Sequence, residues 1–333
     1  MRADARGEQA VPLVGDCSQN GTSATYRNIP ARQKEPSVVL VRSTMQQAIV
    51  CSNPDVACWR SVPELPEVEF ARRQLEPVMA GRRFERVTLR RPDLRSPFPH
   101  DFSPRLVGET ALRVDRRAKY LVVPLSSGET LVMHLGMSGS FSVERVAVDV
   151  QPARHDHVVF HMSSGAAVIF NDPRRFGFMD LIEPDALATH PVLSALGPEP
   201  LSDAFNGASL ARACRGRKTT LKAALLDQRV VAGLGNIYAV EALHLAHLSP
   251  HRRASTIATP SGAPREPAVR LAAAIKRVLI QAIARQMQYG DSGTRFRVYD
   301  REARPCRRQG CAGTIRRRIQ GGRSTFFCPV CQR

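Results

Sequence analysis

The sequence predicts an α+β multidomain protein, in which a β-sandwich with a flanking helix precedes a helical domain and a small C-terminal β-hairpin. Three observations predict this order. Short strand-like runs separated by turn residues dominate residues 84–171, which is typical of a sandwich or barrel. Apolar residues at helical spacing dominate residues 218–288. Four of the eight cysteines lie within the last 28 residues, a clustering that favours a metal site over a disulfide framework.

The chain is strongly basic, with 333 residues and a formal net charge of +18 at pH 7. Residues 1–61 hold seven basic and five acidic side chains, so +16 of this charge belongs to the remainder. A positive excess of this size makes a polyanion the first partner to consider, either nucleic acid or an anionic membrane surface. No run of about 18 uncharged apolar residues occurs, so we expect no membrane span.

Residues 1–61 differ from the rest because they mix Ser, Gln, Asn, Thr and Arg without a sustained helical or strand period. The run 38–41 is too short for the core of a signal peptide, and acidic residues are not depleted as in a transit peptide. We therefore expect residues 1–62 to be a disordered extension, or a segment absent from the native protein.

The expected elements follow in order along residues 66–288. A helix is expected over 66–80, where apolar residues share one face and Gly81 follows as a stop signal. Strands are expected over 84–90, 111–117, 120–125, 130–135, 158–162 and 167–171. Ser-Ser-Gly turns at 126–128 and 163–165 close two hairpins. A linker is expected over 184–200, followed by helices over 218–226, 237–244 and 267–288.

The C-terminal cysteines have the spacing of a metal site, Cys306-x4-Cys311-x16-Cys328-x2-Cys331. Four thiolates can complete a tetrahedral zinc shell, and each close pair can chelate from a tight turn. A hairpin this small cannot bury enough apolar surface to fold without a metal. The alternatives are four unrelated thiols or two disulfides, and we prefer one structural Zn²⁺. Six arginines in the same module indicate contact with phosphate.

Six short motifs resemble, in order, those of the formamidopyrimidine-DNA glycosylases, within the broader formamidopyrimidine/endonuclease VIII family. The resemblance covers about the whole of residues 63–333, and six motifs in the family's order are far more specific than any one of them. The motifs lie at 63–69 (PELPEVE), 117–121 (RAKYL), 134–139 (HLGMSG), 155–157 with 172–177 (HDH, DPRRFG), 226–238 (a helix–two-turn–helix element) and 322–328 (GRSTFFC).

The resemblance implies base-excision repair of duplex DNA by removal of oxidised bases, chiefly ring-opened purines, followed by strand cleavage by β,δ-elimination. It implies that Pro63 is the nucleophile, because an amino-terminal secondary amine can attack C1′ of the damaged nucleotide. Glu64 would act as general acid and base on the opened sugar, and Lys119 would assist as a phosphate contact or proton donor. Glu67 is expected to meet the helix dipole. Glu241 would help to organise the site, and the alternative for it is an exposed helix acid.

The same match implies a set of DNA-binding residues. Some would fill the gap left by the flipped nucleotide and contact its orphaned partner, and others would hold phosphates around the lesion. Ordinary core packing is the alternative for the two apolar members of the first group. The first group is Met137, Arg174 and Phe176, and the second is Lys222, Asn236 and Arg323. We expect a monomer that acts on damaged double-stranded DNA in the cytoplasm.

The implied domains are a catalytic β-sandwich at 63–190, a helix–two-turn–helix DNA-binding domain at 191–295 and a zinc finger at 296–333. Pro63 can be a nucleophile only as a free amine, and inside a longer chain its nitrogen is an inert amide. Our hypothesis is that translation begins at Val62, followed by removal of the initiator. Proteolytic maturation, or an extended protein without lyase activity, is the alternative.

The segment between Gln288 and Tyr299 is shorter than the family's lesion-capping loop, which weakens the expectation of 8-oxoguanine excision. An endonuclease VIII-like enzyme for oxidised pyrimidines therefore remains an alternative. A non-catalytic zinc-finger DNA-binding protein would explain the charge and the cysteines, although not the pairing of Pro63 and Glu64 with Lys119.

Overall fold

The computed structural model describes residues 62–145, 153–289 and 296–333. By its contacts the chain divides into two units, Met1–Ala57 and Cys58–Arg333, and everything below concerns the second. The expected extension at 1–62 lies outside the described residues except for Val62, and the short segment that replaces the capping loop lies mostly outside them.

Two antiparallel sheets form the N-terminal part of this unit, as predicted. One has the strand order β2-β1-β7-β8-β6 and the other the order β3-β4-β5-β9. The first comprises β1 (Arg82–Leu89), β2 (Thr110–Ala111), β6 (Ser140–Arg145), β7 (Asp156–Met162) and β8 (Ala166–Asn171). The second comprises β3 (Asp115–Arg117), β4 (Tyr120–Pro124), β5 (Thr130–His134) and β9 (Phe178–Ile182). A shared apolar core lies between them, with Phe84, Leu121 and Phe160 fully buried.

The single strand expected over 111–117 is wrong. Ala111 pairs with Arg82 in the first sheet, whereas Asp115 pairs with Val122 in the second. The chain therefore crosses from one sheet to the other between these residues, and a strand cannot continue through the crossing. Strands β6 and β9 were not expected from the sequence.

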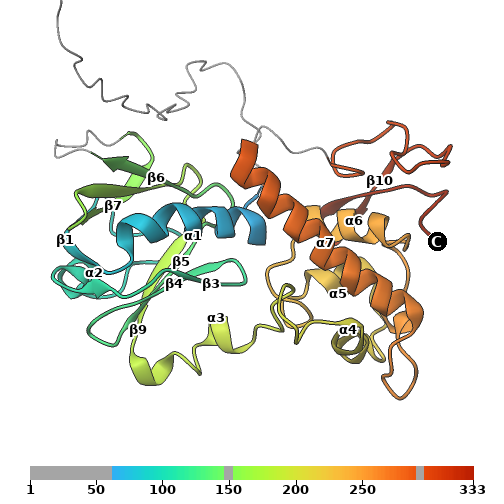
Figure 1. Cartoon of the computed structure of the whole chain (residues 1–333), viewed down its shortest axis with the longest axis horizontal. Coiled ribbons are helices and arrows are strands. Elements are labelled where there is room, and N and C mark those ends of the chain that lie inside the picture. Colours follow the sequence, from blue (N-terminus) through green and yellow to red (C-terminus); the bar gives the residue numbers. More distant parts are fainter. Residues whose placement is uncertain (1–61, 146–152, 290–295) are drawn as a thin grey trace, which may run out of the picture. The chain divides into compact units, whose positions relative to one another are not determined.

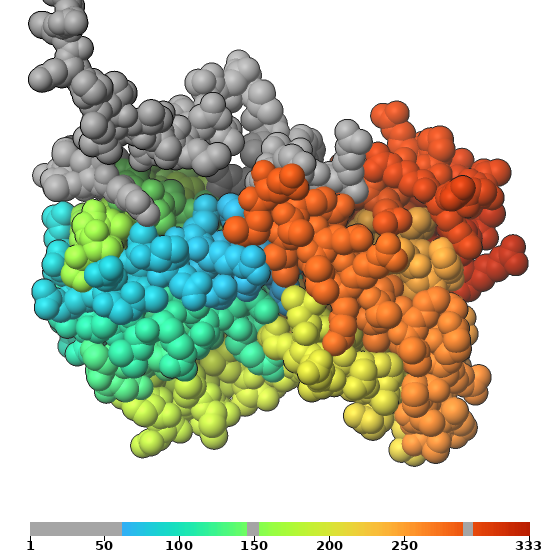
Figure 2. Space-filling model, viewed as in Figure 1, coloured from blue at the N-terminus to red at the C-terminus, as the bar shows by residue number. Residues whose placement is uncertain are grey.

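Helix α1 (Leu65–Met79) flanks the sandwich, and its buried face includes Val68, Leu75 and Met79. In Figure 1 it runs across the strands toward the long helix α7 (Glu266–Tyr289), and the two helices are in contact. Figure 2 shows them side by side on the same face. Short helical segments complete this part: α2 (Phe102–Leu106), η1 (Pro184–Ala186) and α3 (Pro191–Ser194), the last two within the expected linker.

A second core holds the helical part together, with Leu225, Ile237, Leu243 and Leu279 among its buried residues. Its helices are α4 (Gly207–Cys214), α5 (Leu221–Leu226), α6 (Asn236–Leu245) and α7, with the 3₁₀ turn η2 (Ala254–Ile257). The expected helices at 218–226, 237–244 and 267–288 are confirmed within a few residues. Cys214 is fully buried in this core, as a structural cysteine should be.

The C-terminal hairpin consists of β10 (Arg316–Gln320) and β11 (Arg323–Phe327). A small cluster under it contains Ile315, Phe326 and Val240, the last from α6. The hairpin therefore rests directly on α6. Over the described ranges, no helix has both the length and the apolar character that a membrane span requires.

Candidate active site

Glu64 joins α1 to the first turn of α6. Its buried carboxylate accepts hydrogen bonds from the backbone N–H groups of Gly235 (2.7 Å), Ile237 (2.8 Å) and Tyr238 (3.4 Å). These N–H groups are free because the first turn of a helix has no internal acceptors for them. A Cβ on Gly235 would lie 2.3 Å from the carboxyl carbon of Glu64, so only glycine admits the carboxylate here.

Glu67 lies in the first turn of α1 and caps the start of the helix. One carboxylate oxygen accepts from the backbone N–H of Glu64 at 2.8 Å, and the other accepts from the hydroxyl of Tyr238 at 2.6 Å. Burial raises the pKa of Glu67 to about 7, with the neighbouring Glu64 contributing. Burial also raises the pKa of Glu64, opposed by the charge of Lys119 and by the three backbone N–H groups. The helix-start role expected for Glu67 is therefore present alongside this link to α6.

Pro63 lines a cavity of about 150 Å³ beside these acids. The lining is mainly apolar, with contributions from α1, from the loop before β6 and from α7. It comprises Pro63, Glu67, Phe70, Ala71, Gln74, Leu135, Ser138, Gly139, Ser140, Phe141 and Gln286. The cavity therefore joins Pro63 and Glu67 to the loop before β6 and to α7.

Lys119 lies in the two-residue turn between β3 and β4. Glu199, from a distant part of the chain, hydrogen-bonds this turn. The carboxylate of Glu199 accepts from the backbone N–H of Ala118 at 2.5 Å and from Arg117 at 2.9 Å. Ala118 has a φ of 54°, a conformation that costs a non-glycine residue about 1 kcal/mol or more. Burial lowers the pKa of Lys119, and the charge of Glu64 opposes this shift. Lys119 and Glu64 therefore lie close enough for their charges to interact.

Met137, Arg174 and Phe176 lie on two adjoining loops. Met137 and Phe176 keep exposures of 36% and 40%, so core packing, the alternative for both, is wrong. The guanidinium of Arg174 lies 4.9 Å from the centre of the Phe176 ring, a cation–π distance. A Cβ on Gly136 would lie 2.2 Å from the backbone carbon of Phe176, which shows how closely the loops approach.

Asp172 holds these loops together and is completely buried. Its carboxylate accepts from the Ser138 hydroxyl at 2.5 Å, from the backbone N–H of Gly177 at 2.8 Å and from that of Arg174 at 3.3 Å. The loop carrying Met137 and the loop carrying Phe176 therefore share one buried carboxylate.

Lys222, Asn236 and Arg323 meet at the hairpin. The ammonium of Lys222 donates to the carbonyl of Ser324 (3.2 Å) and to the Thr325 hydroxyl (2.7 Å), and the Asn236 amide donates to the same carbonyl at 3.1 Å. Lys222 is almost completely buried, and burial, with the charge of Arg323, lowers its pKa to about 8. Lys222 and the exposed Arg323 both line an open groove of about 730 Å³.

Glu241 is buried, so the interpretation of it as an exposed helix acid is wrong. Its carboxylate accepts from the backbone N–H groups of Arg297, Val298 and Tyr299 at 2.8–2.9 Å. It thereby fixes the start of the C-terminal segment onto α6.

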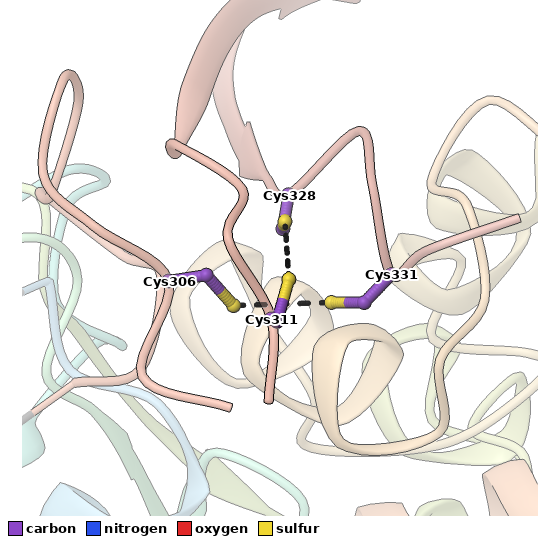
Figure 3. A group of neighbouring side chains, drawn as sticks. All are labelled: Cys306, Cys311, Cys328 and Cys331. Atoms are coloured by element: carbon purple, nitrogen blue, oxygen red, sulfur yellow. Dashed lines mark hydrogen bonds between the residues drawn. The ribbon is translucent and has the colours of Figure 1, made fainter. Parts of the chain in front are cut away.

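The four cysteines converge on one point, as Figure 3 shows. Sγ of Cys306 lies 3.8 Å from that of Cys331, and Sγ of Cys311 lies 3.6 Å from that of Cys328. Ligands about 2.3 Å from a tetrahedral centre lie about 3.8 Å apart, so the four sulfurs fit a metal ion. The spacing alone had predicted this cluster.

Reasoning from the sequence missed three residues that organise the site: Asp172, Glu199 and Tyr238. Asp172 stands inside a recognised motif, which was the available signal. Glu199 follows the Leu-Gly-Pro run at the end of the expected linker, and nothing in the sequence connects it with Lys119, 80 positions earlier.

Comparisons with known proteins agree with this geometry. The formamidopyrimidine-DNA glycosylase N-terminal domain family matches residues 62–179, and the H2TH domain of the same enzymes matches 196–294. A formamidopyrimidine-DNA glycosylase of Rhodopseudomonas palustris (strain BisA53) is 54% identical over 297 residues, covering 82% of this chain and 100% of the relative. One of Bradyrhizobium sp. (strain ORS 278) is 54% identical over 293 residues, with the same coverage.

Solved structures give the same picture. The Lactococcus lactis formamidopyrimidine-DNA glycosylase, non-covalently bound to DNA containing an abasic site, has a TM-score of 0.70 and 30% identity, covering 81% of this chain and 100% of that one. The enzyme from Thermus thermophilus has a TM-score of 0.68 and 38% identity, covering 81% and 98%. Fold and site together define a DNA-repair glycosylase with a four-cysteine hairpin. More particularly, the chain belongs to the formamidopyrimidine-DNA glycosylase family.

Proposed function

We propose that this protein excises oxidised bases, chiefly ring-opened purines, from duplex DNA and then cleaves the strand by β,δ-elimination, in the cytoplasm. The observation that carries the proposal is that Pro63, which lines a cavity, is followed by a buried Glu64 whose charge interacts with that of Lys119. The Lactococcus lactis relative was solved with DNA containing a formamidopyrimidine lesion, which supports the choice of lesion.

The chemistry requires that Pro63 carry a free secondary amine, so we propose that the active form begins at this residue. Its nitrogen forms a bond to C1′ as the bond between C1′ and the base breaks. Cleavage of the C1′–O4′ bond, with a proton delivered to O4′, then opens the sugar and gives an iminium. The iminium acidifies the neighbouring sugar protons, and loss of these protons expels first one phosphate and then the other. An α-amino group has a pKa of about 8 in peptides, so a useful neutral fraction exists at cellular pH.

Glu64 and Lys119 supply the proton transfers. Burial raises the pKa of Glu64, which favours a carboxyl that can donate a proton to the opening sugar and later accept one. Burial lowers the pKa of Lys119, so its ammonium gives up a proton to the same sugar more readily. The N–H groups of α6 hold the Glu64 carboxyl still between these steps.

The exposed loops and the hairpin groove bind the DNA. Met137 and Phe176 fill the space that the flipped nucleotide leaves, and Arg174 hydrogen-bonds the orphaned base. Arg323 and Asn236 contact phosphates around the lesion. Lys222 supports the same groove, because its buried ammonium holds Ser324 and Thr325 next to Arg323.

The metal is proposed to be one structural Zn²⁺, held by Cys306, Cys311, Cys328 and Cys331. Four thiolates are a donor set typical of structural zinc, and such a shell leaves no open position for substrate. When bound, the ion contributes folding free energy to the hairpin that carries Arg323.

Borohydride trapping tests the proposal. Protein prepared to begin at Pro63 should form a covalent adduct with duplex DNA containing a formamidopyrimidine lesion. The matched control carries one uncleaved residue before Pro63, so the same side chains are present and only the amine becomes an amide. Arg323→Ala at high DNA concentration should retain the adduct. Equal trapping by the amide-blocked control would contradict Pro63 as nucleophile, and absence of trapping on every lesion would favour a binding protein.

A second candidate is an endonuclease VIII-like activity on oxidised pyrimidines. The observation in its favour is that the Lactococcus lactis relative was also solved with DNA containing an oxidised pyrimidine. A panel of lesions decides between the two. We expect formamidopyrimidine to be excised faster than 8-oxoguanine, and comparable rates would contradict the inference drawn from the short segment before Phe296.

A further inference from the structure

His244 lies in the last turn of α6, buried against the cysteine cluster. Its Nε2 lies 3.3 Å from Sγ of Cys306 and 3.9 Å from Sγ of Cys331. The residue is 2% exposed, so water does not compete for this nitrogen. His244 lies outside the sequence motifs that mark the site.

The orientation of the ring decides which nitrogen carries the hydrogen. Within the described part of the chain, Nδ1 of His244 is buried and has no hydrogen-bond partner. Thiolates only accept hydrogen bonds, so a neutral ring facing two of them is favoured with its hydrogen on Nε2. The geometry is therefore that of an N–H donor shared between two sulfurs.

The other cysteines have donors within their own turns. The backbone N–H of Arg308 faces Cys306 and that of Gly313 faces Cys311. Backbone N–H groups of Val330 and Cys331 face Cys328. For Cys331 the donor is the imidazole of His244, which comes from helix α6 and not from the C-terminal segment that carries the cysteines.

We propose that His244 is a positioning residue of the metal centre, whose Nε2–H donates to the Cys331 and Cys306 thiolates. This inference rests on the proposed Zn²⁺. Four thiolates around a divalent cation carry a net charge of −2, and burying that charge is costly unless donors surround the sulfurs. His244 supplies one such donor without joining the ligand shell, and it ties the cluster to α6.

Zinc affinity, measured by chelator competition on the full-length protein, tests the proposal. His244→Phe keeps a planar ring in the space and removes the donor, and we expect its zinc affinity to fall by roughly 10–100-fold. His244→Gln restores a side-chain N–H and should recover part of that loss. The matched control is His251→Phe, because His251 contacts the same hairpin through the Phe327 ring, with centres 4.9 Å apart. It should leave the affinity unchanged.

Spectroscopy separates a donor from a ligand and from a packing residue. In ¹¹³Cd-substituted protein, long-range ¹H–¹⁵N spectra should show His244 with its hydrogen on Nε2 and without direct coupling to cadmium. Direct coupling, a hydrogen on Nδ1, or unchanged zinc affinity in His244→Phe would each overturn the proposal. Wild-type protein that binds no zinc would overturn the proposed metal as well, so the two failures are distinguishable.

Discussion

The proposed catalytic acid Glu64 and the loops proposed to contact DNA are built in opposite ways. Glu64 is buried and receives three backbone N–H groups from α6. Met137 and Phe176 instead present apolar surface to solvent. The exposed pair nevertheless stands on a rigid base, since Asp172 joins the two loops beneath it. The group proposed to transfer protons is thus fixed directly, whereas the side chains proposed to enter DNA are left free and only their supports are fixed.

This contrast has a physical reason. A proton donor must keep its distance and its pKa within narrow limits, and burial with backbone donors provides both. A wedge gains its binding energy only when DNA covers it, so its apolar surface must be uncovered before that. Substitutions should therefore divide into those that stop chemistry, those that loosen the fold and those that weaken DNA binding alone.

Glu64→Gln should have the largest effect. Gln keeps an acceptor oxygen for α6 and loses the proton-transfer function, so excision in single-turnover kinetics should slow by about 10²–10⁴-fold. Because both carboxylate oxygens accept from α6, Gln leaves at least one N–H group without an acceptor, and about 1–3 kcal/mol of stability should also be lost. Thermal unfolding measures this loss, and the rates are compared well below the melting temperature. A variant that unfolds early and yet retains its rate would show that Glu64 is only a structural anchor.

Asp172→Ala should affect stability next most strongly. It leaves the Ser138 hydroxyl and the N–H groups of Gly177 and Arg174 without their acceptor, at a cost of about 2–4 kcal/mol in the free energy of unfolding. Urea denaturation measures this. Ser138→Ala removes one of the same hydrogen bonds and should cost about 1 kcal/mol. Equal losses in both variants would contradict a shared support.

Glu67→Gln should change the pH dependence of stability. Because burial raises the folded-state pKa of Glu67 from 4.5 to about 7, the folded state binds its proton more tightly than the unfolded state does. This contribution is present below pH 4.5 and is lost as the pH rises toward 7, with a slope of at most about 1.4 kcal/mol per pH unit.

Melting temperatures of Glu67→Gln should show a shallower slope between these two pH values, because burial also raises the pKa of Glu64 and that contribution remains. Glu69 on the same helix is the matched control, because hydrogen bonds from Arg72 and Arg73 outweigh burial and lower its pKa. Glu69→Gln should leave the slope in place, and an undiminished slope in Glu67→Gln would assign it to another group.

The combined change Met137→Ala and Phe176→Ala should have the smallest effect on the fold, within about 0.5 kcal/mol. Excision from duplex DNA should slow by about tenfold, equivalent to about 1.4 kcal/mol. Urea denaturation and single-turnover kinetics on one preparation measure both. A loss of stability that matches the loss of activity would show that these side chains are core residues after all.

Local patterns in the sequence predicted much of this structure. Strand-like runs located five strands approximately (β1, β4, β5, β7 and β8), and helical spacing located α1, α6 and α7. Cysteine spacing located the metal cluster, because chelation from tight turns leaves a local signature. The strand expected over 111–117 failed because a change of sheet leaves no mark in a hydrophobic pattern.

The contacts that make the site could not be predicted in this way. Glu64 and Gly235 are 171 positions apart, and nothing in the composition of either segment shows that the helix start and the carboxylate meet. The glycine is the one trace of that contact, since its missing Cβ is the space that Glu64 occupies. The motif that contains Gly235 was therefore recognisable from the sequence. The reason for a glycine at that position became visible only in the folded structure.

Helix α6 spans the distance between the Glu64 carboxylate and the cysteine cluster. Its first turn binds the Glu64 carboxylate, and its last turn faces the cysteines. Ten residues at 1.5 Å each give a rod of about 15 Å. One residue inserted along the rod would rotate everything beyond it by about 100°, turning His244 away from the sulfurs while Glu64 stayed in place. The length of this helix fixes the separation of the Glu64 carboxylate from the cysteine cluster, and that separation can change only by whole residues.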